Sequence, residues 1–234
     1  MRYSEFRRYF PAEKKRADAF FTRVVLRPLS FPTAWLLYRL NITANQVTLA
    51  CIALALAGFV FLIPGVLVLS LVAGALFLLV ALGDCVDGNI ARARGDSGPS
   101  GEWMDALCGY TVYALLPLAL GLQLELMRTE ALFAGMWVLV GAVTAISNLY
   151  LRLVYQKYAN CIRSDATDDD EGSKGGLLSR ISGEVGLVGW MMPALLLAVV
   201  LGLESFYLLF YCIFYLSAAV VGTIILARRI LYAE

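Results

Sequence analysis

Six apolar runs, each close to the length of a membrane-spanning helix, decide what this chain can fold into. A helix needs about 20 apolar residues to cross the ~30 Å hydrocarbon core of a bilayer, where every backbone polar group must be bonded internally. The composition, 60% hydrophobic and 16% charged, is far from that of a soluble domain. The sequence therefore predicts an all-α membrane protein with six transmembrane helices, in the runs 46–63, 66–83, 104–122, 131–150, 185–203 and 205–227.

The segment before the first apolar run has a different character. Residues 4–28 mix aromatic and aliphatic side chains with basic ones, among them Arg23 and Arg27. This mixture predicts a helix that lies in the membrane interface, broken at Pro11, with its basic side chains on lipid headgroups. We therefore divide the chain into an interfacial amphipathic segment, 1–42, and a six-helix transmembrane domain, 43–234.

The distribution of charge predicts how the chain is oriented. Six spans place both termini on one side, and that side receives all of the 19 Lys and Arg residues except Arg128. By the positive-inside rule this side is the cytoplasm, which indicates a multi-pass protein of the bacterial inner membrane or a comparable membrane. Membrane lipids are expected partners, and no nucleic acid is expected.

Three acidic residues stand beside two apolar runs in the stretch GDCVDGNIARARGDSGPSGEWMDALCGY, residues 83–110. If the preceding helix continues past Gly83, Asp84 and Asp87 share one face, and Asp105 lies on the helix that follows. Carboxylates that converge at a membrane are costly and repel one another unless a cation lies between them. Because hard oxygen ligands suit Mg²⁺ and Mn²⁺, the stretch predicts a divalent metal held by Asp84, Asp87 and Asp105.

Four small residues surround the three acids, namely Gly88, Ala91, Gly101 and Gly109. They leave the helix surfaces bare, which makes a slot for a flat ligand. Arg92, beside this slot, is suited to binding phosphate oxygens. The pattern as a whole indicates a site for a nucleotide together with a metal.

The stretch resembles the signature of the CDP-alcohol phosphotransferases, D-x2-D-G-x2-A-R-x8-G-x3-D-x3-D. Seven of its eight specified residues are present at the right spacing, from Asp84 to Asp105. The segments RPLSFPTAWLLYRLNITANQVTLA and NLYLRLVYQKYA are similar to the family's first and fourth transmembrane regions. The resemblance covers at least residues 27–160.

The resemblance implies six helices around a polar cavity that faces the cytoplasm, often in a homodimer. The family moves a phospho-alcohol from a CDP-linked donor, such as CDP-diacylglycerol, to an acceptor and releases CMP, with phospholipid synthesis as the usual setting. Asn45 and Thr48 stand in ITANQVT, where Ala44 replaces the family's usual proline. By the same likeness, the metal is Mg²⁺ or Mn²⁺, and the residues expected at the nucleotide are Asn45, Thr48, Gly88, Ala91, Arg92 and Gly101.

One position departs from the family pattern. The last Asp of the signature, which the resemblance makes the general base, would fall at position 109, where this chain has Gly109. Three interpretations stay open. Another carboxylate replaces the base, with Glu102 and Glu184 as candidates; or the protein binds nucleotide without catalysing a reaction; or the acceptor needs no base because its nucleophile is already ionised.

The third interpretation suits a phosphate monoester acceptor such as a polyprenyl phosphate. General-base assistance raises the reaction rate of a hydroxyl nucleophile roughly 10²- to 10⁴-fold. An oxyanion has no proton to give up, so its reaction rate falls little when the base is absent. Gly109 also removes a negative charge that would repel such an acceptor. The basic residues expected to hold the acceptor's phosphate at the cytoplasmic helix ends are Arg152, Lys157 and Arg163.

Overall fold

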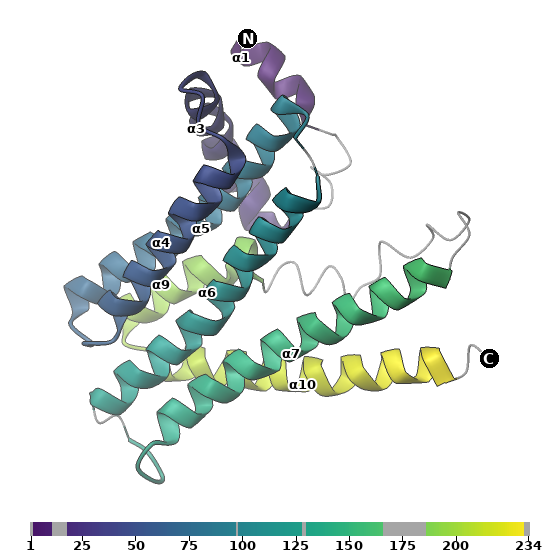
Figure 1. Cartoon of the computed structure of the whole chain (residues 1–234). Coiled ribbons are helices and arrows are strands. Elements are labelled where there is room, and N and C mark those ends of the chain that lie inside the picture. The colour runs from purple at the N-terminus through teal and green to yellow at the C-terminus, as the bar shows by residue number, and fades with distance from the viewer. Residues whose placement is uncertain (1, 11–17, 97, 128–129, 166–185, 232–234) are drawn as a thin grey trace.

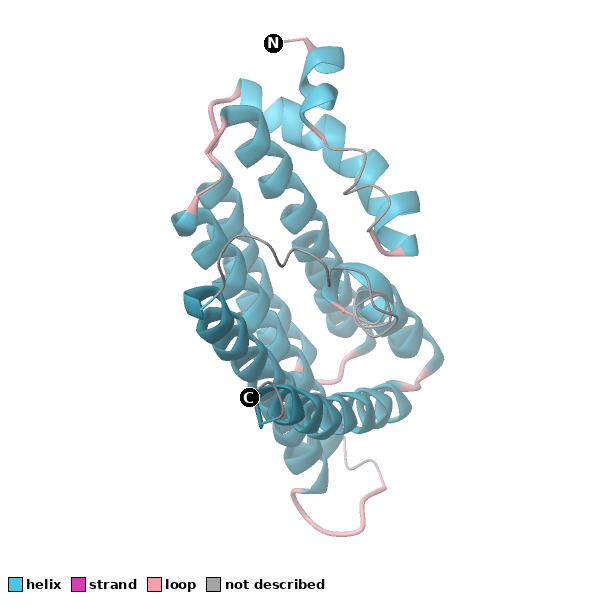
Figure 2. Ribbon diagram, turned by 90° about the vertical axis from the view of Figure 1, so that its right-hand side faces the viewer, coloured by secondary structure: helices cyan, strands magenta, loops and turns pink. Residues whose placement is uncertain are grey.

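The computed structural model describes residues 2–10, 18–96, 98–127, 130–165 and 186–231 (Figure 1). Within these ranges the chain forms helices joined by short turns, and Figure 2 shows no strand. The predicted all-α class is confirmed. In chain order the helices are α1 (Tyr3–Phe6), η1 (Arg7–Tyr9), η2 (Thr22–Leu26), α3 (Arg27–Arg39), α4 (Ala44–Leu62), α5 (Leu67–Arg94), α6 (Pro99–Leu126), α7 (Met136–Asp165), η3 (Leu187–Met191), α9 (Met192–Leu201) and α10 (Glu204–Leu231).

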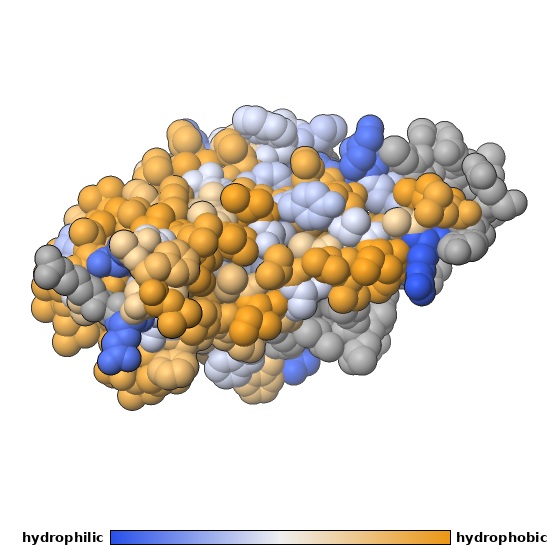
Figure 3. All heavy atoms as spheres, turned by 90° about the horizontal axis from the view of Figure 1, so that it is seen from below, coloured by the Kyte–Doolittle hydropathy of each residue, from blue (hydrophilic) through white to orange (hydrophobic). Residues whose placement is uncertain are grey.

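Five of these helices are long and apolar enough to cross a membrane: Ala44–Leu62, Leu67–Arg94, Pro99–Leu126, Met136–Asn160 and Glu204–Leu231. Their outer faces carry large exposed apolar side chains, and the face in Figure 3 is largely hydrophobic. In water such a surface would be costly, whereas in lipid it is matched to its surroundings. The chain is a multi-pass membrane protein.

The fifth predicted span differs from the other five. Its residues form the short π-helical turn η3, in which Gly189 has non-helical torsions (φ −88°, ψ −131°), followed by α9 with Pro193 in its first turn. At ~1.5 Å per residue, the ten residues of α9 reach only about half of the hydrocarbon thickness. The predicted count of six spans is therefore not confirmed: the described residues contain five helices of membrane-spanning length, and the fifth predicted run forms one broken, shorter segment.

The tyrosine side chains of two neighbouring helices hold this break in place. The Tyr113 hydroxyl accepts a hydrogen bond from the Leu187 backbone N–H at 2.8 Å, and the Tyr207 hydroxyl donates to the Met191 carbonyl at 3.0 Å. A backbone that leaves helical geometry inside a membrane protein needs such partners for its polar groups. The interruption of the fifth segment is thus built into the packing of α6 and α10.

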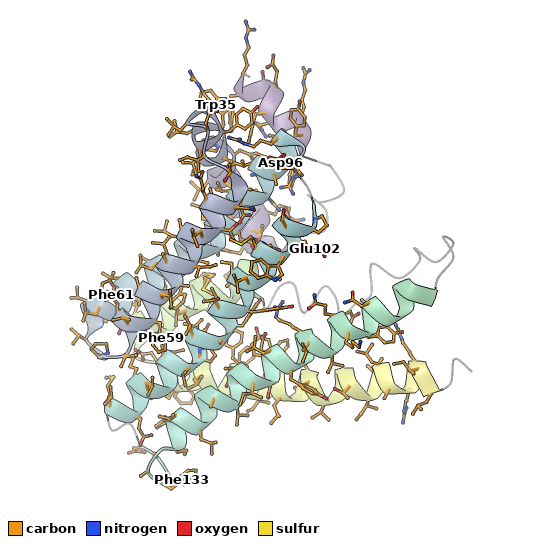
Figure 4. All side chains as sticks on the ribbon, in the orientation of Figure 1. Trp35, Phe59, Phe61, Asp96, Glu102 and Phe133 are labelled. Atoms are coloured by element: carbon orange, nitrogen blue, oxygen red, sulfur yellow. The ribbon has the colours of Figure 1, made fainter. Side chains whose placement is uncertain are left out.

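The long helices pack in a fixed order. Helix α4 packs against both α5 and α6, α6 packs against α7, and α7 lies beside α10 (Figure 1). Although α5 and α6 are consecutive, they make few direct contacts because α4 lies against both. In Figure 4, Asp96 and Glu102 mark the connection between α5 and α6 at one end of the bundle, whereas Phe133 lies at the opposite end.

The crossing of α6 and α7 depends on two glycines. A Cβ atom added at Gly141 would lie 2.5 Å from the Pro117 carbonyl oxygen and 3.3 Å from the Gly121 Cα. Small residues of this kind let helix backbones approach closely in membranes. The atoms in the way are backbone atoms, so an added methyl group has to push the helices apart.

We therefore expect Gly141→Ala to destabilise the protein by about 1–3 kcal/mol, the usual cost of overpacking. The measurement is the midpoint of thermal unfolding in detergent. Gly109→Ala is the matched control, because a Cβ at Gly109 meets nothing within 4 Å. Equal losses in the two variants would show that the crossing is not tightly packed.

The N-terminal segment packs against the end of α5 through α3 and η2. Its predicted interfacial helix is not confirmed, and the predicted break at Pro11 lies outside the described residues. Arg27 requires a correction: it was expected on lipid headgroups, but it is only 7% exposed and forms an ion pair with Asp18 at 2.7 Å. A buried guanidinium keeps its charge when a carboxylate is beside it, and Asp18 supplies that carboxylate.

Candidate active site

The first two acids lie on the last turns of α5. This helix continues without interruption through Gly83 to Arg94, as the shared face of Asp84 and Asp87 requires. It ends where Gly95 adopts a left-handed conformation (φ 73°), a common helix terminus that glycine accepts at little cost. Asp84 and Asp87 therefore project from one regular helix.

The third acid lies on α6, which begins at Pro99. Asp105 is exposed, while Asp84 is half-buried. The Asp84 carboxyl group nevertheless lies close enough to Asp105 and Asp87 for their charges to act on it. Neighbouring carboxylates repel one another unless a proton or a cation lies between them. Asp84 of α5 and Asp105 of α6 are therefore neighbours, while the predicted convergence of all three acids stays a prediction.

Asp87 is tied to a different helix. Its Oδ2 accepts a hydrogen bond of 2.7 Å from Thr48 Oγ1 of α4, and Asp87 is only 8% exposed. Thr48 also bonds to the Ala44 carbonyl oxygen at 3.1 Å, so its hydroxyl is held in place. Thr48, which was expected near the nucleotide diphosphate, thereby links α4 to the acids of α5.

A complete metal-ligand cluster is not assembled. Among the described residues, no three His, Cys, Asp or Glu side chains are grouped so that they could hold a metal ion. Asp84 and Asp105 are together, whereas Asp87 is bonded to Thr48 one helical turn away. The carboxylate oxygens and the hydroxyl suit a hard divalent cation, and the thiols of Cys51, Cys85 and Cys108 are also near these acids. The metal assignment of the three acids stays a prediction.

The small residues of the motif differ in what they face. At Gly88, a Cβ would lie 3.3 Å from the Arg92 guanidinium, so the bare surface of this glycine accommodates that side chain. At Gly101, the nearest atom is the Asp96 carbonyl oxygen at 3.9 Å, which leaves ordinary room. Ala91 is half-buried. Space for a cytidine beside these residues stays a prediction.

Asn45, the remaining residue expected at the nucleotide, is exposed in the first turn of α4. That turn begins at Thr43, whose hydroxyl accepts a hydrogen bond from the Gln46 N–H while the Gln46 side chain accepts one from the Thr43 N–H. This capping box starts α4 without the proline that the family usually has at position 44. The N-terminus of α4 is therefore stabilised by these two hydrogen bonds and not by a proline.

The region around Gly109 is open, and a cation lies near it. A Cβ at Gly109 would meet nothing within 4 Å. One turn further along α6, the ring of Tyr113 is covered by the Arg152 guanidinium, whose carbon lies 3.9 Å from the ring centroid. Arg152 Nε donates to Asn148 Oδ1 at 2.8 Å, which holds the guanidinium over the ring. Arg152 thus belongs to the same part of the bundle as Gly109.

Among the described residues, no hydrogen bond or ion pair joins the other residues proposed around the acceptor to Gly109, Tyr113 or Arg152. Lys157 is exposed on α7. Arg163 lies near the end of α7, and its side chain is outside the described residues, as is the whole of Glu184. Glu102 is exposed in the first turn of α6, one turn before Asp105. Their roles stay predictions.

Several polar and aromatic residues that lie on or contact the motif helix were not identified from the sequence. Asn89 hydrogen-bonds to Ser30 of α3 and to Arg92, and Phe10 lies between the guanidinium groups of Arg27 and Arg92. The spacing of Asn89 and Arg92 by three residues on a helix is a signal that was available. The contributions of Phe10 and Ser30 depend on the tertiary fold alone.

An apolar cavity of about 410 Å³ lies elsewhere, between α9 and α10. Its lining includes Trp190, Leu197, Phe206 and Tyr211 and none of the acids of the motif. A surface of this kind faces lipid chains and offers no group for phosphate chemistry. The polar site at the ends of α4, α5 and α6 is therefore the candidate active site.

A comparison with protein families identifies the chain. The model of the CDP-alcohol phosphatidyltransferase family matches residues 41–225, which include the motif and all of the long helices but the last turns of α10. No curated protein matches the chain closely enough to serve as a relative. The family match covers most of the sequence and agrees with the acids found together at α5 and α6. The chain belongs to the CDP-alcohol phosphatidyltransferase family.

Proposed function

We propose that this protein is a metal-dependent transferase that moves a substituted phosphate group from a CDP-linked donor, such as CDP-diacylglycerol, to an acceptor and releases CMP. Family membership supports transfer from a CDP-alcohol. The observation that carries the proposal is the contact of Asp84 with Asp105 between α5 and α6, beside Asp87 and Thr48. Phospholipid synthesis is the setting in which we place the reaction.

The reaction needs an acceptor oxygen to attack the phosphorus of the transferred group while the bond from that phosphorus to the oxygen of CMP breaks. Mg²⁺ or Mn²⁺, when bound, neutralises charge on the diphosphate and on the departing CMP. The residues that would hold it are Asp84, Asp87 and Asp105. Arg92 supports the nucleotide end, and the rigid ends of α4, α5 and α6 align donor and acceptor.

The topology that we propose places the site at the cytoplasmic face. Residues 1–42 form a segment at the membrane interface, and residues 43–234 form the catalytic domain, with both termini in the cytoplasm. The broken segment η3–α9 then counts as the fifth of six crossings. The asymmetry of Lys and Arg supports this orientation. A homodimer in the inner membrane is the proposed assembly.

A second candidate concerns the acceptor. The open space at Gly109 and the guanidinium of Arg152, which covers the Tyr113 ring one turn further along α6, both favour an acceptor that is already an anion, such as a polyprenyl phosphate. Such an oxyanion attacks without giving up a proton, so no base is required. A hydroxyl acceptor would have to pass its proton to another group, and Glu102 and Glu184 remain the candidates.

The experiment that tests the function measures CMP release by the purified protein. CDP-diacylglycerol and other CDP-linked donors are offered with Mg²⁺ or Mn²⁺ and with a panel of hydroxyl and phosphate acceptors. Release of CMP that depends on one acceptor supports the transferase and identifies the acceptor class. Nucleotide binding without turnover across the panel would instead indicate a nucleotide-binding protein that does no chemistry. Mass spectrometry of lipids from cells with and without the protein reports the product independently.

A further inference from the structure

The guanidinium of Arg92 is held in one place by three neighbours. It lies over Gly88, where a Cβ would come within 3.3 Å of it. Its Nη2 donates a hydrogen bond of 2.8 Å to Asn89 Oδ1, and the guanidinium carbon lies 5.5 Å from the centroid of the Phe10 ring. Its Nε is buried and has no hydrogen-bond partner among the described residues. Arg92 is therefore held in place and keeps N–H donors that no described residue binds.

Asn89 can present only its oxygen to Arg92. The Ser30 hydroxyl donates its proton to the Arg27 carbonyl oxygen at 3.1 Å, so Ser30 Oγ is left as an acceptor. Asn89 Nδ2 donates to that oxygen at 3.2 Å. Because the amide nitrogen of Asn89 is committed to Ser30, its carbonyl oxygen is directed at the guanidinium. Asn89 is only 4% exposed and Ser30 is fully buried, so water does not compete for these bonds.

Arg27 lies near Arg92, and a carboxylate neutralises the charge of Arg27 but not that of Arg92. Arg27 is paired with Asp18 through two hydrogen bonds of 2.7 and 2.8 Å. Burial is the largest single effect and lowers the pKa of Arg27, but the hydrogen bonds and charge of Asp18 together with the nearby Cys85 and Asp84 more than offset it, and the pKa is raised above its ordinary value. Arg92 has no acidic partner among the described residues. The charge of Arg92 is thus available to a bound anion.

Phe10 shields both guanidinium groups. Its ring centroid lies 4.6 Å from the guanidinium carbon of Arg27, and its ring meets Phe31 edge to face at 5.3 Å. An aromatic ring over a guanidinium stabilises the charge and restricts its orientation. The N-terminal segment thereby packs on the back of the motif helix, with α3 supplying Ser30 and the segment before it supplying Phe10.

We infer that Asn89 is a positioning residue, anchored by Ser30 of α3, that orients the Arg92 guanidinium toward the diphosphate of the CDP-linked donor. This inference rests on the proposed function, since it assumes that a cytidine nucleotide binds beside the acids. It extends the nucleotide site to the N-terminal segment, which the sequence had assigned to the membrane interface. Asn89 acts through Arg92 and does not itself touch the donor.

The test measures the affinity of the purified protein for CDP by calorimetry in the presence of Mg²⁺. Asn89→Ala should bind CDP about tenfold more weakly, the loss that corresponds to one hydrogen bond to a charged group. Ser30→Ala leaves the bond between Asn89 and Arg92 in place but frees Asn89 to rotate, so its loss should be smaller. Thr33→Ala is the matched control, because the Thr33 hydroxyl bonds only to its own helix, at the Leu29 carbonyl.

A double-mutant comparison separates positioning from mere stability. In an Arg92→Ala background, Asn89→Ala should cause no further loss of CDP affinity, since the group that it orients is gone. Unchanged CDP affinity in Asn89→Ala, or a loss that persists in full in the Arg92→Ala background, would overturn the inference while leaving the proposed function intact. Absence of CDP binding by the unmodified protein would overturn the proposed function and the inference with it.

Discussion

Replacing Asp84 with Asn should slow CMP release by about 10³-fold, the scale seen when one preorganised electrostatic group is removed from an active site. The variant keeps the shape of the side chain but loses the charge that faces Asp105. Because the two carboxylates repel each other when no cation lies between them, the variant should be at least as stable as the unmodified protein without metal. The measurements are the rate of CMP release and the midpoint of thermal unfolding.

The effect of divalent metal on stability gives a reading that does not depend on turnover. A cation that binds only the folded protein raises its stability, by about 2.7 kcal/mol at a hundredfold excess over the dissociation constant. Mg²⁺ or Mn²⁺ should therefore raise the unfolding midpoint of the unmodified protein and not that of Asp84→Asn. Asp96→Asn removes an exposed carboxylate from the connection between α5 and α6 and is the control. Turnover by Asp84→Asn at the unmodified rate would contradict the assignment of this residue.

Replacing Gly109 with Asp should distinguish the two kinds of acceptor. A Cβ at this position meets nothing within 4 Å, so the substitution is expected to fold. Two like charges about 4 Å apart interact by roughly 4 kcal/mol at the effective dielectric of a protein surface. If the acceptor is an ionised phosphate, its transfer rate should fall by about 10²-fold or more. Rates with phosphate and hydroxyl acceptors are measured side by side.

The opposite result has an equally definite meaning. A carboxylate at 109 is a general base for a hydroxyl acceptor, and such assistance is worth roughly 10²- to 10⁴-fold. Faster transfer to a hydroxyl by Gly109→Asp would refute the ionised acceptor. Gly109→Asn is the control, because it has nearly the same size and no charge. A phosphate acceptor should react faster with Gly109→Asn than with Gly109→Asp.

The helices and the motif were readable from the sequence because both depend on local order. Apolar runs of membrane length and the spacing of Asp84, Asp87 and Asp105 follow from the rise and turn of a helix. The shared face of Asp84 and Asp87 depended on the condition that the helix continues past Gly83, and this condition is met because α5 extends to Arg94. Composition and positive-inside charge likewise need no tertiary contact. These features determined the class of protein and located the candidate site.

The fifth segment shows where hydropathy alone is insufficient. Its run of apolar residues is as long as the others, yet Gly189 and Pro193 interrupt the helix. A hydrogen bond from the Leu187 N–H to the Tyr113 hydroxyl and one from the Tyr207 hydroxyl to the Met191 carbonyl fix the interruption. Average hydropathy measures transfer into lipid and does not report which backbone groups find partners. The partners come from α6 and α10, which are distant in sequence.

The position of Arg27 in the N-terminal segment was wrongly predicted for the same reason. The sequence around Arg27 has the composition of a segment that binds lipid headgroups, but the fold buries Arg27 against Asp18 and Phe10. Whether a basic residue faces lipid headgroups or a buried carboxylate is decided by long-range packing. Nothing in the periodicity of residues 4–28 contains that information.

By itself, the sequence determined that the chain crosses a membrane as helices and that three carboxylates and Arg92 lie at the ends of two of them. Only the tertiary structure decided that Asp84 meets Asp105 while Asp87 bonds to Thr48, and that Arg92 is held by Asn89 and Phe10. The physical reason is the distance along the chain over which each kind of interaction acts. Helical periodicity acts over a few residues, whereas the partners of a buried charge are chosen by packing between helices far apart in the chain.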